Sequence, residues 1–153
     1  MKPVTRARRK NGRERGSAVL EFALCACLLL MIAAGVTDFS RFITAADLAA
    51  SAAAAGAQYG ALSPANYGDL TGMQNAALMD ASSFPNATAV ASQVCACSVG
   101  GSPVSCPANC TYQGESPETY IKVTVNIPFT PLFPYPWIPA ATSVASSSTV
   151  RVQ

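Results

Sequence analysis

The sequence predicts an α+β protein in which a long N-terminal transmembrane helix continues into a small outer domain with a second short helix and about three antiparallel strands. Three observations predict this class: one apolar run of membrane length, helical periodicity without proline over residues 4–63, and a late segment in which apolar and polar residues alternate. We expect three parts, namely a basic cytoplasmic leader at 1–16, a transmembrane and extended helix at 17–60, and an extracytoplasmic α+β domain at 61–153.

The leader is polar and strongly basic. Residues 1–16 carry a net charge of +6, whereas residues 17–153 carry −4. A basic segment can bind nucleic acid, but one placed directly before an apolar run more often sets membrane orientation through the positive-inside rule. We therefore expect a cytoplasmic N-terminus and no nucleic-acid partner.

The apolar run from Ala18 to Val36 has 19 residues and one charge. As a helix it would be roughly 28 Å long, close to the ~30 Å hydrocarbon core of a bilayer. Its single carboxylate, Glu21, would cost on the order of 2.5–3.5 kcal/mol in lipid, which makes it a candidate functional residue. Cys25 and Cys27 point about 200° apart on a helix, so we interpret them as small apolar residues rather than joint metal ligands.

Helical periodicity continues beyond the run, so one helix is expected from about Ser17 to Tyr59. Asp38 and Arg41 are spaced to pair across one turn. The last part of this helix is rich in alanine and contains Gly56. Small residues permit a close approach of backbones, so this part is expected to cover one face of the sheet.

The remaining chain predicts a helix at 69–83 and strands at 88–99, 119–127 and 143–152. The segment 127–139 contains five prolines and six large apolar residues, and is predicted not to form a central strand. Two interpretations of this segment stay open: a loop that touches a partner or the bilayer, and a polyproline-like crossover packed on the sheet.

Four cysteines lie in the predicted outer domain, two of them within its first predicted strand: Cys95, Cys97, Cys106 and Cys110. In an oxidising compartment, thiols at the ends of a hairpin more often form disulfides than bind zinc, and each disulfide would contribute ~2–4 kcal/mol. We favour the nested pairing, with Cys97–Cys106 inside Cys95–Cys110, because it suits an antiparallel hairpin.

The N-terminal region allows three fates. Signal peptidase could cut after the apolar run, near residues 33–35; a prepilin-type peptidase could cut between Gly16 and Ser17; or the segment could remain as an uncleaved anchor. Glu21 favours cleavage between Gly16 and Ser17, since a carboxylate early in the apolar run gains nothing for an ordinary signal peptide.

Gly16, with Glu21 as the fifth residue after it, resembles the processing site of type IV prepilins and pseudopilins. The pair Glu21-Phe22 is especially similar to the Flp and TadE/TadF proteins of the tight-adherence (Tad) pilus. Two further elements look like those of TadE-like proteins: the motif Asp38-Phe39-Ser40-Arg41 and the small-residue run at 54–60.

The resemblance implies a TadE-like pseudopilin that supports Flp/Tad pilus biogenesis, adhesion and biofilm formation. It implies a single-pass location in the inner membrane, possible entry into the pilus, and as partners a prepilin peptidase, other pseudopilins or pilins, and the inner-membrane assembly platform. We expect no enzymatic activity, cofactor or metal, because the chain has no histidine, no nucleophile–base set and no phosphate-binding loop.

Two alternatives stay open. One is a signal-anchored extracytoplasmic domain that binds metal or thiols through its four cysteines. The other is a minor pseudopilin of a type II secretion system, although Ser17 stands where that class usually has phenylalanine.

Overall fold

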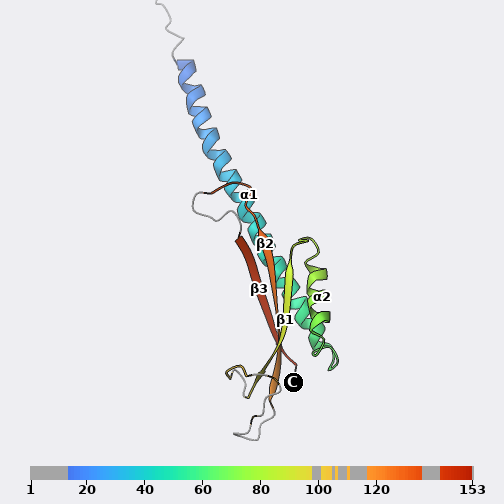
Figure 1. Ribbon diagram of the computed structural model, residues 1–153. Coiled ribbons are helices and arrows are strands. Elements are labelled where there is room, and N and C mark those ends of the chain that lie inside the picture. Colours follow the sequence, from blue (N-terminus) through green and yellow to red (C-terminus); the bar gives the residue numbers. More distant parts are fainter. Residues whose placement is uncertain are drawn as a thin grey trace, which may run out of the picture. The chain divides into compact units, whose positions relative to one another are not determined.

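The computed structural model describes residues 14–97, 101–104, 106, 110, 117–135 and 142–152. The predicted leader up to residue 13 and the end of the Pro-rich segment, 136–139, lie outside these residues. The elements follow in the order α1 (Glu14–Ala61), α2 (Leu70–Asp80), β1 (Thr88–Ala96), β2 (Glu118–Phe129) and β3 (Thr142–Arg151) (Figure 1). The predicted α+β class, with a long first helix, a short second helix and three antiparallel strands, is confirmed.

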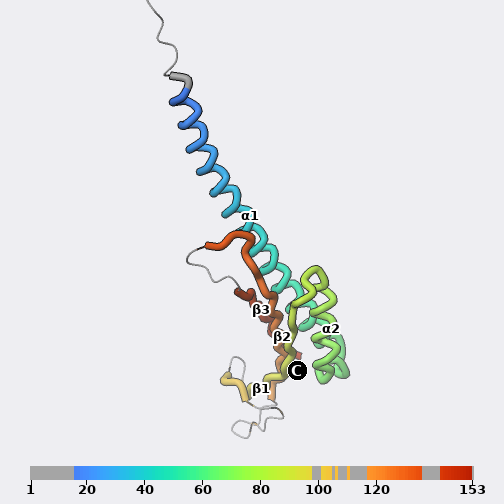
Figure 2. Tube along the Cα trace, turned by 45° about the horizontal axis from the view of Figure 1, so that its top comes forward, coloured from blue at the N-terminus to red at the C-terminus, as the bar shows by residue number. Residues whose placement is uncertain are grey.

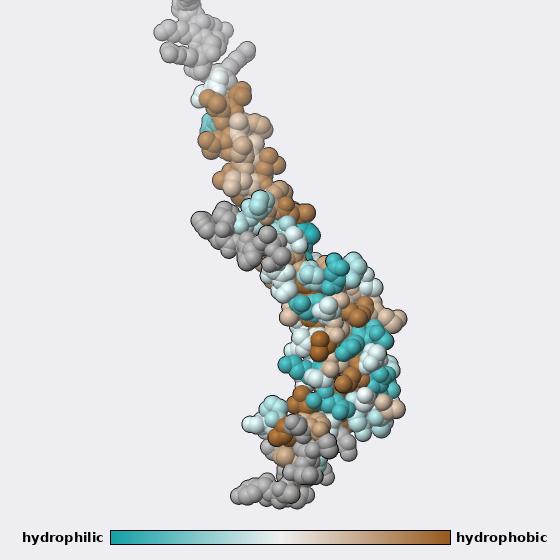
Figure 3. All heavy atoms as spheres, in the orientation of Figure 1, coloured by the Kyte–Doolittle hydropathy of each residue, from teal (hydrophilic) through white to brown (hydrophobic). Residues whose placement is uncertain are grey.

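The chain forms two compact units, residues 1–39 and residues 40–153, and α1 contributes to both. In the first unit, the described residues from Gly16 to Ala33 are exposed except for Ala26, which is half-buried. Brown, hydrophobic spheres dominate this part of the helix in Figure 3. Within the described residues, α1 is the one helix whose length and composition allow it to cross a membrane. These features are consistent with membrane anchoring.

The second unit, which we call the C-terminal module, contains the sheet. Its strands are antiparallel in the order β1-β2-β3, so β2 is central. The alternation seen in the sequence is reproduced in β2, where four apolar side chains are fully buried and their neighbours are more exposed. The buried side chains are Ile121, Val123, Val125 and Ile127.

The segment 127–139 is predicted not to form a central strand, and the structure differs from the predicted strand 119–127 only in that β2 continues through Pro128 to Phe129. The register gives the reason. β1 pairs with β2 only as far as Asn126, which lies opposite Thr88. β3 pairs with β2 up to the last residue of β2, Phe129, and Ser143 lies opposite Pro128. Beyond Asn126, β2 has a neighbour on one side only, and proline is tolerated where a strand is an edge.

The alanine-rich half of α1 packs on the sheet, as the sequence predicts. Together with the four buried side chains of β2, five helix alanines and two residues of α2 form one core. These residues are Ala45, Ala49, Ala52, Ala53 and Ala57 of α1, and Met73 and Ala77 of α2. Figures 1 and 2 both show this part of α1 running alongside the sheet, with α2 next to it. Alanine side chains are short, so the helix backbone can come close to its neighbours.

The backbones of α1 and α2 come close together at Gly56. A Cβ atom at this position would lie 2.8 Å from the backbone oxygen of Met73, 3.0 Å from Cγ1 of Val123 and 3.1 Å from Cβ of Ala77. There is no space for a side chain there. Glycine at this position therefore allows α1, α2 and β2 to meet.

A capping interaction fixes the start of α2. Asp69 is the N-cap residue, and its Oδ1 accepts a hydrogen bond of 2.8 Å from the backbone N–H of Gly72. Its Oδ2 accepts a second one of 3.1 Å from the hydroxyl of Tyr59, near the end of α1. An aspartate cap satisfies a backbone donor that would otherwise have no partner within the helix. The same carboxylate thus starts α2 and ties it to α1.

Candidate assembly sites

The predicted processing site lies on the exposed start of α1. Gly16 and Ser17 are exposed, and a Cβ atom added at Gly16 would have nothing within 4 Å. Glu21 is exposed as well and lies four residues after Ser17, so both are on one face of the helix, about 6 Å apart along its axis. Among the described residues, none forms an ion pair or hydrogen bond with Glu21.

Glu21 is surrounded by exposed apolar side chains. Phe22, its neighbour in the predicted motif, has 75% of its surface exposed, and Leu20 and Leu24 are similarly exposed. A carboxylate among such side chains is costly in lipid unless it finds a partner. The arrangement therefore offers one acidic contact on an otherwise apolar helix surface, which suits helix–helix recognition within a membrane.

The predicted helix motif divides between the two units. Asp38 is buried and Phe39 is exposed, both at the end of the first unit. Arg41 belongs to the C-terminal module. The predicted pairing of Asp38 with Arg41 stays a prediction.

Arg41 has partners that sequence reasoning missed. Its guanidinium carbon lies 5.5 Å from the ring centre of Phe129, which is within the range of a cation–π contact. Its Nη1 also donates a hydrogen bond of 3.5 Å to the backbone oxygen of Thr130. The neighbouring Phe42 meets the same Phe129 ring edge to face, with centres 5.5 Å apart. Arg41 and Thr130 are 89 residues apart in the sequence, so no local pattern could reveal their contact.

All four predicted disulfide cysteines form disulfides, but the favoured nested pairing is wrong. The bonds join Cys95 to Cys106 and Cys97 to Cys110, with Cα atoms 5.4 and 5.3 Å apart. Cys25 and Cys27 are free and exposed on α1.

The backbone pairing of Cys95 with the chain after β1 explains the Cys95–Cys106 bond. Cys95 is paired with Val104 through two backbone hydrogen bonds, with N–O distances of 2.7 and 3.4 Å. Cys106 is therefore two residues past the partner of Cys95 and can reach it diagonally. The nested pairing needs Cys97 opposite Cys106, which this register does not provide.

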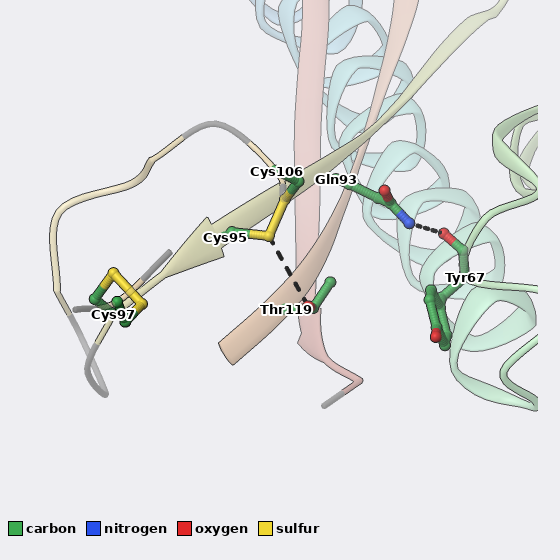
Figure 4. The surroundings of a disulfide bond; sticks show 7 residues. Tyr67, Gln93, Cys95, Cys97, Cys106 and Thr119 are labelled. Atoms are coloured by element: carbon green, nitrogen blue, oxygen red, sulfur yellow. Dashed lines mark hydrogen bonds between the residues drawn. A yellow bond between two sulfur atoms is a disulfide. The ribbon is translucent and has the colours of Figure 1, made fainter. Parts of the chain in front are cut away.

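The Cys95–Cys106 disulfide contacts the central strand, β2. Figure 4 shows Thr119 of β2 beside Cys95, and the hydroxyl oxygen lies 3.9 Å from Sγ. Thr119 is the donor in this weak contact, because a disulfide sulfur carries no hydrogen. Gln93, also on β1, donates a hydrogen bond of 2.6 Å to the backbone oxygen of Tyr67 (Figure 4). β1 is thus joined to the loop before α2 as well as to the disulfide loop.

The disulfides also bear on the metal-binding alternative. Zinc binds cysteine as the thiolate, and a sulfur already joined to another sulfur is not available in that form. All four sulfurs, those of Cys95, Cys97, Cys106 and Cys110, are in disulfides. The structure therefore favours two disulfides over a metal site made of thiolates.

The pairing gives a testable prediction for the protein in a background where Cys25 and Cys27 are replaced by serine. The non-reduced protein should have a mass about 4 Da below that of the reduced protein, because each of two disulfides lacks two hydrogens. Removing one bonded pair, in C95S/C106S, should leave no thiol that reacts with iodoacetamide. Removing one member of each bond, in C95S/C110S, should leave two reactive thiols. If C95S/C110S shows no reactive thiol and C95S/C106S shows two, the nested pairing is correct after all.

Comparison with known families matches residues 16–58 to the family described as TadE-like protein. The matched segment begins at Gly16, contains Glu21 and the motif at 38–41, and ends within the small-residue run. Searches of curated proteins and of solved structures found no match. The matched residues coincide with those that carry the resemblance, and so the chain is similar to TadE-like proteins over residues 16–58.

Proposed function

We propose that this chain is a pseudopilin, a minor pilin-like component of Tad/Flp pilus assembly. The observation that carries the proposal is the combination, within the TadE-like segment, of Gly16, Glu21 and a helix whose apolar side chains are uncovered. The match to the TadE-like family also favours a Tad pilus over a type II secretion system. In this proposal the role is structural rather than enzymatic, and it supports pilus biogenesis, adhesion and biofilm formation.

The proposed topology has the basic leader in the cytoplasm and the C-terminal module on the far side of the inner membrane. The charge asymmetry of the sequence supports this orientation. The two disulfides support an oxidising compartment for the module, because such bonds form and persist outside the cytoplasm. Proposed partners are a prepilin peptidase, other pseudopilins or pilins, and the inner-membrane assembly platform.

Processing would prepare the helix for assembly. Cleavage between Gly16 and Ser17 removes the basic leader and leaves a new α-amino group at the start of the apolar run. A helix freed of its leader could move along its axis past neighbouring helices. Gly16 suits the cut because a residue without a side chain lets a protease approach the backbone closely.

Co-expression with a prepilin peptidase tests this proposal. N-terminal sequencing of the membrane-extracted protein should read SAVLEF, and Gly16→Leu should retain the intact leader. The matched control is Gly35→Leu, since neither glycine has any atom within 4 Å of an added Cβ and neither change disturbs packing. The control should be cleaved like the wild type. A mature chain that starts near Val36, or one that always starts at Met1, contradicts the proposal.

A further inference from the structure

One edge of the C-terminal module gathers exposed apolar side chains from two distant segments. Phe42 and Ile43 of α1 are 37% and 42% exposed, and Leu132 and Phe133, which follow β2, are 59% and 47% exposed. We call these four residues the apolar rim. Elsewhere in the module, large exposed apolar side chains such as Leu62 occur on other elements, and scattered exposed apolar residues are normal for folded proteins.

Phe129 joins the two halves of the rim. Its ring contacts Phe42 edge to face and also lies 5.5 Å from the guanidinium carbon of Arg41. Leu132 is three residues after Phe129, so the chain cannot carry it more than about 11 Å away. Figures 1 and 2 both show the end of β2, in orange, running beside α1. The rim is therefore one feature of the module.

Phe42 and Ile43 follow the membrane-length apolar run closely in the chain. Arg41 is five residues after Val36, the last residue of the apolar run. Even a fully extended chain spans at most about 18 Å over five residues, and a helix spans about 8 Å. The polar interfacial layers make a bilayer ~40–45 Å thick around its ~30 Å hydrocarbon core. Each interfacial layer is therefore about 5–7.5 Å thick. On α1 the backbone of Phe42 lies about 9 Å beyond Val36, and its side chain leans back toward the helix N-terminus, so the ring extends toward this layer.

The composition of the rim fits this layer. Phenylalanine and leucine are typical of the apolar side of segments that lie in the membrane interface, and arginine can place its alkyl stem along apolar groups while its charged end stays in a polar environment. Arg41 meets this description, because its guanidinium is beside Phe129 and the oxygen of Thr130 at the exposed edge of the module.

We infer that the apolar rim inserts into the boundary between lipid headgroups and acyl chains, so that the module rests on the bilayer instead of only being tethered to it. Of the two interpretations left open for the Pro-rich segment, contact with the bilayer is thereby assigned to Leu132 and Phe133. The inference concerns the isolated membrane protein and does not depend on pilus assembly. A second copy of the chain on the rim is the competing occupant, and the experiment separates the two.

Tryptophan fluorescence of the full-length protein in phosphatidylcholine liposomes tests the inference. The chain has one tryptophan, Trp137, which is replaced by phenylalanine so that the parent protein has no tryptophan fluorescence. A single probe is then placed in the rim as Phe133→Trp, or as Leu132→Trp if the first variant fails to fold. The control probe is Leu62→Trp, because Leu62 is 76% exposed and lies one residue after the end of α1, about 30 Å from Phe42 along the helix axis.

The rim probe should be quenched several-fold more strongly than the control by lipids brominated near the headgroup, and its emission should shift to the blue. Equal and weak quenching of both probes overturns the inference. A blue-shifted rim probe that lipid bromines do not quench, and whose emission changes on dilution of the protein in the membrane, also overturns it and identifies a second copy as the occupant.

Discussion

Replacing Gly56 by valine is expected to destabilise the C-terminal module strongly. The first atom of a new side chain would lie 2.8 Å from the backbone oxygen of Met73 and 3.0 Å from Cγ1 of Val123. A backbone oxygen within α2 cannot move away alone, so the helix itself must shift. Overpacking of this kind costs typically about 1–3 kcal/mol, and the two further methyl groups of valine add to it.

Alanine at the same position offers a graded test. Within a helix, Gly→Ala normally gains about 1 kcal/mol, so a loss of stability in Gly56→Ala would have to come from the contact with α2. Gly60→Ala should be milder, because the added atom meets the ends of the flexible Met73 and Ile121 side chains. Gly35→Ala should leave stability unchanged or raised, since nothing lies within 4 Å there.

Thermal unfolding of the full chain in detergent, followed by circular dichroism, measures this series. For a module of this size, each kcal/mol lost at the midpoint lowers the melting temperature by about 4–8 °C. The expected order of melting temperatures is Gly35→Ala, Gly60→Ala, Gly56→Ala and then Gly56→Val, from highest to lowest. If Gly56→Val melts with the wild type, the close approach of α1 to α2 is not what glycine provides.

The second large effect is expected at Glu21. Under the proposed function, cleavage creates a charged amine on Ser17, and both this amine and the Glu21 carboxylate are costly in lipid when unpaired. Within one helix, the amine is four residues away along the helix wall, which is a poor geometry for a pair. A neighbouring helix displaced along the axis can bring its own amine to Glu21, and such a pair offsets much of the cost of both charges.

Glu21→Gln should therefore leave membrane insertion and Gly16–Ser17 cleavage largely intact, while piliation and co-purification with other pseudopilins fall strongly. The amide keeps the size of the side chain and removes its charge. Asp47→Asn is the matched control, because Asp47 is also an exposed carboxylate on α1 but lies in the C-terminal module. The control should assemble normally. If Glu21→Gln forms pili like the wild type, Glu21 has no role in assembly and is only a tolerated carboxylate at the membrane surface.

Much of the fold could be read from local patterns. The long α1, the short α2 and the buried face of β2 each follow from a periodicity of hydrophobic residues, and periodicity is a property of neighbouring residues. The observed α2 and the strands differ from the predicted ranges only at their ends, where caps and pairing partners decide. Asp69, for example, became the N-cap of α2 and not its first residue.

The sequence by itself determined one apolar helix with a single carboxylate and an α+β module, and it favoured two disulfides among four cysteines over a metal site. Only the tertiary structure decided which cysteines are partners, because this depends on the register that places Val104 opposite Cys95. It also decided that Pro128 is accepted in β2, since β1 pairs no further than Asn126. Likewise, Arg41 contacts Phe129 and Gly56 contacts α2 because packing brings together segments that are distant in the chain, and no local pattern records such contacts.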